Sequence, residues 1–192
     1  MALDYEKARL KELIIQNALF VSLEPITLSS GQKTHHYYDL KKVLSDAEGL
    51  KLISILMLEE VLKMGDVKSV GGLETGAIPI AVGISRESFG NENLHSFFVR
   101  KQRKAHGLGN LLEGDIMEPT VIVDDVITKG DSVLKAIDAL KRAGKVMKGV
   151  VSIIDRGGGK ENLETKWIKH VSLFEDKDFE QVVKERLAKL EA

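Results

Sequence analysis

Two adjacent carboxylates, Asp124 and Asp125, are the residues of the chain best placed to do chemistry. They follow the apolar run at 121–123, and the loop after them, 128–132, leads into a helical pattern. A helix N-terminus presents unpaired N–H donors and a partial positive charge, which suit a phosphate monoester. Carboxylates accept hydrogen bonds from vicinal sugar hydroxyls and stabilise a developing sugar cation. The segment therefore predicts a site for a phosphorylated sugar; the alternative is an ordinary strand, acidic turn and capped helix.

A second feature is a cluster of positive charge at 100–104, where four of five residues are Lys or Arg. No acidic residue follows until Glu113, although the whole chain has a net charge of -1. Such a cluster suits a polyanion such as pyrophosphate, and Gly107 and Gly109 would let the segment open and close over a site. A solvated basic loop is the alternative. Contact with RNA is disfavoured, because no aromatic residue interleaves the charges to stack on bases.

The elements that must position these groups alternate between strand-like and helical segments. Apolar residues at helical spacing predict a helix at 4–18, with Asp4 as its N-cap, and one from Ser45 to a stop at Gly65. Strands are expected at 67–70, 94–99, 120–126, 146–154 and 167–174, with further helices at 78–87, 132–143 and 176–190. This alternation predicts an α/β fold with a mostly parallel central sheet flanked by helices, whose ligands gather at the carboxyl ends of the strands. Segments 21–40 and 101–118 fit neither pattern, so we expect long loops there, which usually carry function.

Composition limits the class of protein. The chain has 192 residues, 28 basic and 29 acidic, and 43% are hydrophobic. A chain of this length buries roughly 70 % of its extended surface, so we expect one domain, 1–192. The near-neutral charge disfavours nucleic-acid binding, and the absence of Cys excludes disulfides and a cysteine nucleophile. With no apolar signal core and no run approaching the ~20 residues of a membrane span, we expect a cytoplasmic protein without membrane contact.

The segment 123–132 resembles the phosphoribosyl-pyrophosphate (PRPP) motif of type I phosphoribosyltransferases, with two acids, two apolar residues, Thr-x-Gly and a hydroxyl residue. The resemblance implies that Asp124 and Asp125 bind the ribose 2′- and 3′-hydroxyls and that 128–132 holds the 5′-phosphate. The PRPP-binding residues it implies here are Asp124, Asp125, Val126, Ile127, Thr128, Lys129, Gly130, Asp131 and Ser132. Asp131 stands where the family usually has a small or hydroxyl residue, and its carboxylate faces the phosphate unless it turns outward to cap the helix.

The spacing Arg-Lys-x-x-Lys-x-His-Gly-x-Gly at 100–109 is similar to the catalytic loop of orotate phosphoribosyltransferases. In that family the loop closes over the pyrophosphate, partly onto the site of the neighbouring subunit of a dimer. The resemblance therefore implies a homodimer in which Lys101, Lys104 and His106 act across the interface. It makes Lys104 the main charge stabiliser, with Arg100 as a further PRPP ligand and Asp125 as the fourth catalytic residue.

Segment 27–40 resembles the N-terminal segment of the same family. Tyr37 and Tyr38 match the aromatic pair that borders the pyrimidine, and Lys33 is the nearest matching cation. Because adjacent strand residues point to opposite faces, we expect at most one of the tyrosines to touch the base. The neighbouring pair His35 and His36 could suggest a metal, but adjacent histidines without acidic partners are more often surface residues.

Segment 71–79 looks like the pyrophosphate loop of the family, here with Glu74, Thr75 and Gly76. The resemblance implies a cis peptide bond, for which Glu74–Thr75 is the expected position. Gly76 occupies a position that is Lys in some relatives. This shifts more of the pyrophosphate contact onto backbone amides and Arg100.

Arg156 ends an apolar strand and matches the family arginine that binds the orotate carboxylate, with Thr128 as a further orotate contact. A guanidinium fits a planar carboxylate in a bidentate manner, and uracil has no such group. Without the other motifs, a salt bridge at the strand end would be the preferred interpretation.

Together the motifs identify the chain as a member of the orotate phosphoribosyltransferase family. The resemblance implies a type I phosphoribosyltransferase fold in which about 1–40 and C-terminal elements form a small hood over the base site. The implied reaction is transfer of the phosphoribosyl group of PRPP to N1 of orotate in UMP synthesis, with Mg²⁺ held mainly by substrate oxygens and no protein metal site. The alternatives are a phosphoribosyltransferase for another nucleobase and a PRPP-sensing regulator, and the sequence has no helix-turn-helix extension to support the latter.

Overall fold

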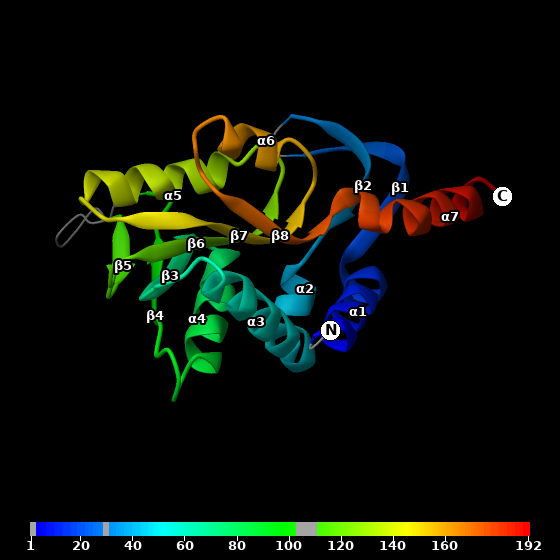
Figure 1. Ribbon diagram of the computed structural model, residues 1–192. Coiled ribbons are helices and arrows are strands. Elements are labelled where there is room, and N and C mark those ends of the chain that lie inside the picture. The colour runs from blue at the N-terminus through cyan, green and yellow to red at the C-terminus, as the bar shows by residue number, and fades with distance from the viewer. Residues whose placement is uncertain (1–2, 29–30, 103–110) are drawn as a thin grey trace.

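The computed structural model describes residues 3–28, 31–102 and 111–192. Its main feature is a six-stranded sheet in the order β5-β4-β3-β6-β7-β8, in which only β5 is antiparallel to its neighbour (Figure 1). The strands are β3 (Ser69–Leu73), β4 (His95–Val99), β5 (Leu112–Gly114), β6 (Thr120–Ile127), β7 (Met147–Asp155) and β8 (His170–Glu175). The predicted α/β class and mostly parallel sheet are therefore confirmed.

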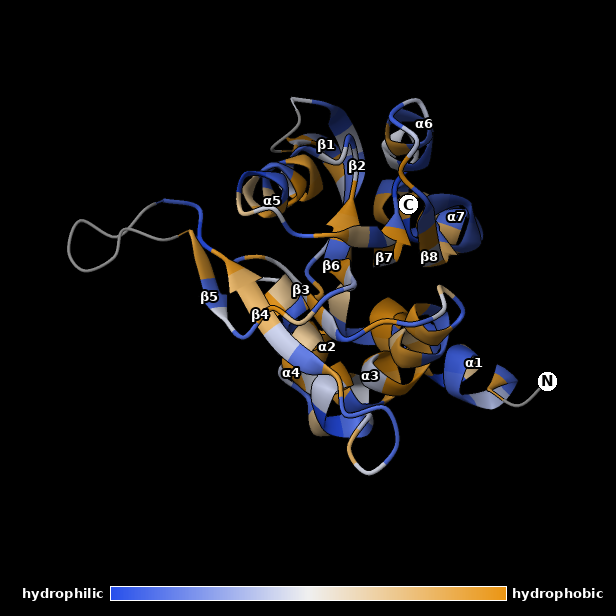
Figure 2. Ribbon diagram, turned by 60° about the vertical axis from the view of Figure 1, so that its left-hand side comes forward, coloured by the Kyte–Doolittle hydropathy of each residue, from blue (hydrophilic) through white to orange (hydrophobic). Residues whose placement is uncertain are grey.

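The central strands are buried on both faces, as their continuous apolar runs require. Val121 and Val123 pack with α3 (Ala47–Leu62) and α4 (Ala77–Glu87), whereas Ile122 between them packs with α5 (Asp131–Arg142). Figure 1 shows α5 and the short α6 (Gly159–Glu164) on one side of the sheet and α3 and α4 on the other. In Figure 2 strands β3 and β4 are mostly hydrophobic, while α1 (Asp4–Leu13) is mostly hydrophilic. The sheet is thus the middle layer of three.

Two predicted helix starts are off by one residue. The N-cap of α3 is Asp46, whose carboxylate accepts a hydrogen bond from the Gly49 N–H at 2.8 Å, and the Ser45 hydroxyl donates instead to the Lys42 carbonyl. Similarly, Asp4 is the first residue of α1, and Leu3 occupies the N-cap position. A π-helical turn, η1 (Ile14–Ala18), continues α1, so the predicted helical span of 4–18 holds.

The prediction of a long loop at 21–40 is wrong. β1 (Leu19–Thr27) and β2 (Lys33–Tyr38) form an antiparallel hairpin with a register shift between Val21 and Ile26, followed by the short α2 (Lys41–Leu44). The shift and the exposure of much of the hairpin remove the regular alternation by which a strand is recognised in a sequence. The second predicted loop, 101–118, contains β5, and its residues 103–110 lie outside the described part of the chain.

The C-terminus returns to the N-terminal hairpin. A 3₁₀ turn, η2 (Asp176–Phe179), leads into α7 (Glu180–Glu191), and the Arg186 guanidinium donates to the carbonyls of Ile15 and Leu19, both at 2.6 Å. Figure 1 shows α7 beside β1. Residues from the two ends of the chain thus form one packed unit. Among the helices of the described ranges, none is long and apolar enough to cross a membrane.

Candidate active site

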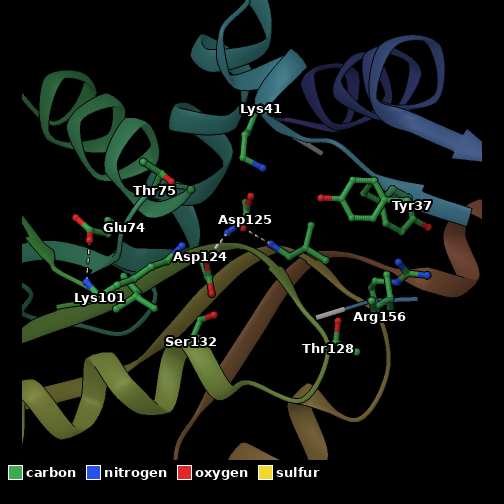
Figure 3. Close-up of a pocket in the computed structure, with 15 residues that line it drawn as sticks. Tyr37, Lys41, Glu74, Thr75, Lys101, Asp124, Asp125, Thr128, Ser132 and Arg156 are labelled. Carbon is green, nitrogen blue, oxygen red and sulfur yellow. Dashed lines mark hydrogen bonds between the residues drawn. The ribbon is translucent and has the colours of Figure 1, made fainter. Parts of the chain in front are cut away.

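A cavity of about 270 Å³ opens at the carboxyl ends of β3, β6 and β7, the position expected for a ligand in a parallel sheet (Figure 3). Its wall is formed by Leu28, Tyr37, Tyr38, Lys41, Leu73, Glu74, Thr75, Gly76, Lys101, Asp124, Asp125, Val126, Thr128, Ser132 and Arg156. Most of the residues predicted from the sequence meet here although they come from five separate segments. Among the described residues that were predicted, Lys33 and Arg100 do not line it, and Ile127, Lys129, Gly130 and Asp131 line a smaller adjoining cavity instead. Lys104 and His106 lie outside the described ranges.

The carboxylate pair lines the cavity near the carboxyl end of β6. Asp124 is 7% exposed, and its Oδ1 accepts a hydrogen bond from the Asp125 N–H at 3.0 Å. Figure 3 shows Asp124 directed toward Ser132. Burial, together with the charge of Asp125, raises the pKa of Asp124 well above the ordinary value of an aspartate. The ionised form of such a buried carboxylate is costly unless hydrogen-bond donors or a cation in the cavity stabilise it.

The turn after β6 forms an adjoining cavity of about 60 Å³ in front of the N-terminus of α5. Residues 126–132 and Asp124 line it, so the remaining predicted phosphate residues Ile127, Lys129, Gly130 and Asp131 are brought together here. Gly130 has φ of 82°, a left-handed conformation that favours glycine. Asp131 is exposed in the first turn of α5. Free N–H groups of a helix N-terminus at this place can bind a phosphate.

The loop after β3 forms the opposite wall, and its Glu74–Thr75 peptide bond is cis, as the sequence predicts. The Lys101 N–H donates to Glu74 Oε1 at 2.8 Å, which ties this loop to the start of the basic cluster. Arg100 points elsewhere: its Nη1 lies 3.8 Å from Glu113 Oε1. The loop and Lys101 therefore place backbone amides and one ammonium group beside the carboxylate pair.

Arg156 closes the far end of the cavity with a side chain only 5% exposed. Its Nη2 donates to Thr34 Oγ1 at 3.2 Å and to the His36 carbonyl at 3.2 Å, and its guanidinium lies 5.2 Å from the centre of the Tyr38 ring. Tyr37 is 38% exposed and Tyr38 only 3%. The two tyrosines thus have different environments, as expected of adjacent residues in a strand.

The turn that carries Arg156 is fixed by the residue before it. Asp155 is buried, and its carboxylate accepts hydrogen bonds from the N–H groups of Gly157 and Lys160 at 2.9 and 3.0 Å. These two bonds fix the backbone from Gly157 to Lys160, where α6 begins. The guanidinium therefore projects from a rigid support.

Sequence reasoning did not assign Lys41, His36 or Asp176 to the site. Lys41 projects from α2, and Figure 3 shows its ammonium group directed into the cavity toward Asp125. His36 is wrongly interpreted as a surface residue: its side chain is 14% exposed and its Nε2 lies 2.9 Å from Asp176 Oδ1, whereas His35 is exposed as expected. None of the three carries a local motif, because their partners are distant in the sequence.

Gly76 offers a direct test of the geometry around Asp125. A Cβ atom at this position would lie 2.6 Å from Asp125 Cγ and 2.7 Å from Oδ2, closer than such atoms approach. We expect Gly76→Ala to displace the carboxylate and to raise the KM for the phosphorylated ligand about tenfold, since small misplacements in a site are costly. In an Asp125→Ala background the same change should have no further effect, because the clash is gone. An unchanged KM in the single variant would contradict this contact.

Comparison with known proteins identifies the family of this arrangement. No family model matches the chain. An orotate phosphoribosyltransferase of Aquifex aeolicus is 39% identical over 174 residues, 88% of this chain and 94% of the relative, and one of Pyrococcus abyssi is 35% identical over 167 residues, 85% and 89%. The solved structure of the Mycobacterium tuberculosis orotate phosphoribosyltransferase in complex with 5-phospho-α-D-ribosyl 1-diphosphate covers 90% of this chain and 98% of its own, with 30% identity and a TM-score of 0.73. On the strength of its sequence, its sheet and its cavity, the chain belongs to the orotate phosphoribosyltransferase family.

Proposed function

We propose that the protein transfers the phosphoribosyl group of PRPP to N1 of orotate, giving orotidine 5′-monophosphate and pyrophosphate in UMP biosynthesis. The observation that carries the proposal is the layout of the cavity: a phosphate turn and a carboxylate pair at one end and the arginine Arg156 at the other. The first two suit a ribose 5-phosphate, and the third suits a base that bears a carboxylate. The related M. tuberculosis protein was solved with PRPP, which supports this choice of donor.

The reaction separates charge, so the protein's contribution is positioning and electrostatics. Asp124 and Asp125 would accept hydrogen bonds from the ribose hydroxyls and stabilise the cationic sugar as the C1′–O bond breaks. The backbone amides of 128–132 would hold the 5′-phosphate. Lys101 and the Glu74–Gly76 loop lie where the leaving pyrophosphate gathers negative charge, and Arg100, Lys104 and His106 are proposed to join them. No nucleophilic residue is required.

We propose Mg²⁺ as the cofactor, held mainly by pyrophosphate and ribose oxygens. Mg²⁺ prefers oxygen ligands, and the carboxylates of Asp124 and Asp125 are the donors of this kind at the ribose end of the cavity. When bound, the ion supplies positive charge to the leaving pyrophosphate. Asp124 and Asp125 would orient the ribose hydroxyls.

Quaternary arrangement and the hood are part of the same proposal. We propose a homodimer in which the basic loop of each subunit reaches the site of the other. We further propose that β1, β2, η2 and α7, which pack together across the two ends of the chain, form a hood over the base within a single domain, 1–192. The hairpin supplies Tyr37 and Tyr38 to the cavity wall, which supports that role. The expected cytoplasmic location stays a prediction.

The test is a substrate comparison with Mg²⁺ and PRPP. We expect orotate to be consumed, measured by its ultraviolet absorbance, and uracil and adenine to be left unused. Arg156→Ala should raise the KM for orotate about 100-fold while the KM for PRPP changes little, because a charge-assisted bidentate pair is lost only at the base end.

Arg142→Ala is a matched control, since this arginine pairs with Asp138 on the exposed side of α5. Preferential use of uracil or a purine would identify a different phosphoribosyltransferase. Normal PRPP binding without consumption of any base would instead indicate a PRPP-sensing regulator.

A further inference from the structure

The guanidinium of Arg156 is surrounded by a cluster of hydrogen-bonding side chains that the reaction itself does not use. The hairpin contributes Thr34 and His36, and η2 contributes Asp176, which lies 140 positions from His36. Asp176 Oδ1 accepts from the Tyr38 hydroxyl at 2.9 Å and lies 3.7 Å from Arg156 Nε. A single carboxylate oxygen thus joins the hairpin to the base end of the cavity.

The protons of the cluster can be placed from its distances. His36 Nε2 lies 2.9 Å from Asp176 Oδ1, an acceptor, and 3.0 Å from Arg156 Nη2, a donor, so it can bond to only one of them. Arg156 Nη2 has other acceptors at 3.2 Å in Thr34 Oγ1 and the His36 carbonyl. A lone pair on Nε2 would face the Asp176 oxygen, which is also an acceptor, at only 2.9 Å. The consistent arrangement has Nε2–H donating to Asp176.

The other side of the imidazole completes this arrangement. In the tautomer with its proton on Nε2, His36 can accept at Nδ1 from the Thr34 hydroxyl at 3.3 Å. The Thr34 oxygen in turn accepts from Arg156. Although burial opposes it, the hydrogen bonds from His36 and Tyr38 lower the pKa of Asp176, which keeps this residue anionic as the cluster requires.

The cluster holds one edge of the guanidinium and leaves the other available. Among the described residues, the hydrogen bonds and the ion pair of Arg156 involve Nη2 and Nε, and none involves Nη1. Because Arg156 lines the cavity, Nη1 is the group left for a ligand there. Asp176 also offsets the positive charge of Arg156, so recognition of an anion depends on directed hydrogen bonds more than on net charge.

We propose that Asp176 and His36 are positioning residues for base specificity: they hold Arg156 so that it selects a pyrimidine carrying a carboxylate. The inference rests on the proposed function and deepens it, because it assigns specificity to residues outside the cavity's reacting end. Neither Asp176 nor His36 is among the residues that line the cavity, in which the ribose and the pyrophosphate are proposed to bind. Their loss should therefore affect the base and spare the donor.

The experiment measures KM for orotate and for PRPP in Asp176→Ala and Asp176→Asn. The alanine variant should raise the KM for orotate about 10- to 30-fold and leave the KM for PRPP within about twofold. Asparagine keeps an oxygen where all three contacts converge, so it should restore the KM for orotate to within about threefold of wild type. Lys177→Ala is the control in the same turn, because its side chain is exposed and pairs with Glu175.

His36→Ala and His35→Ala form a second matched pair, and only the first should raise the KM for orotate. A double-mutant cycle then locates the effect: in an Arg156→Ala background, Asp176→Ala should cause no further change. Equal changes in both KM values, or a full effect in that background, would overturn the inference. Wild-type protein that does not consume orotate would instead overturn the proposed function, so the two failures are distinguishable.

Discussion

Replacing Asp124 by asparagine should make the protein more stable at neutral pH and nearly inactive. The carboxylate is buried beside Asp125, and both burial and that neighbouring charge raise its pKa. The ionised form thus destabilises the fold. We expect Asp124→Asn to raise Tm by about 2–4 °C, because an increase of roughly 1 kcal/mol in the free energy of unfolding has this effect in a chain of this size. Activity should fall about 100-fold or more, because the charge facing the sugar cation is lost.

The pH dependence of unfolding provides an independent check. Since the folded-state pKa lies above the ordinary value of 3.8, protonated Asp124 contributes stability that is fully present below that value. This contribution is lost as the pH rises through the raised pKa. The free energy of unfolding of the wild type, relative to Asp124→Asn, should therefore decrease with rising pH.

Urea unfolding of both proteins at several pH values measures this difference. Asp138→Asn is the control, because its carboxylate is exposed on α5 and pairs with Arg142. A variant that is less stable than the wild type at every pH would show that the charge of Asp124 is fully compensated within the fold.

The part of the site that could be predicted is the part encoded locally. Within 13 residues, 120–132 contain a buried strand, two acids, a glycine in a left-handed turn and the start of a helix. Each feature has its own local signal, and the parallel sheet brings the strand ends to one edge. The family resemblance placed 74–76 and Arg156, which directly follow the observed strands β3 and β7.

The rest depended on contacts between distant residues. Asp176 has meaning only beside His36 and Tyr38, and Lys41 only beside the cavity, so neither has a pattern in its own neighbourhood. The hairpin was missed because its register shift interrupts alternation. At the start of α3 both Ser45 and Asp46 are good caps, and only the bond to Gly49 distinguishes them. Sequence patterns identified the reacting end of the cavity, whereas tertiary structure was needed for the cluster around Arg156.

Lys104→Ala should lower kcat about 100- to 1000-fold while PRPP binding changes only a few-fold. Lys104 lies outside the described ranges, but Lys101, three residues earlier, lines the cavity and is bonded to the Glu74 side chain. The basic cluster therefore starts beside the proposed pyrophosphate end. A cation that acts on charge developing in the transition state lowers the barrier more than it strengthens ground-state binding. Calorimetric titration of PRPP and steady-state rates separate the two quantities, with the exposed Lys135 on α5 as the site of a control alanine.

Mixing Lys104→Ala with Asp125→Asn tests whether that lysine acts on its own subunit or on its neighbour. If the loop reaches across a homodimer, a heterodimer of two inactive chains contains one site with both an intact loop and an intact carboxylate pair. Random exchange at equal concentrations should then restore about one quarter of the wild-type sites. If each loop serves its own subunit, every site carries one defect and the mixture stays inactive. Activity that appears only after subunit exchange, and reaches this level, would establish the shared site; a mixture no more active than its components would refute it.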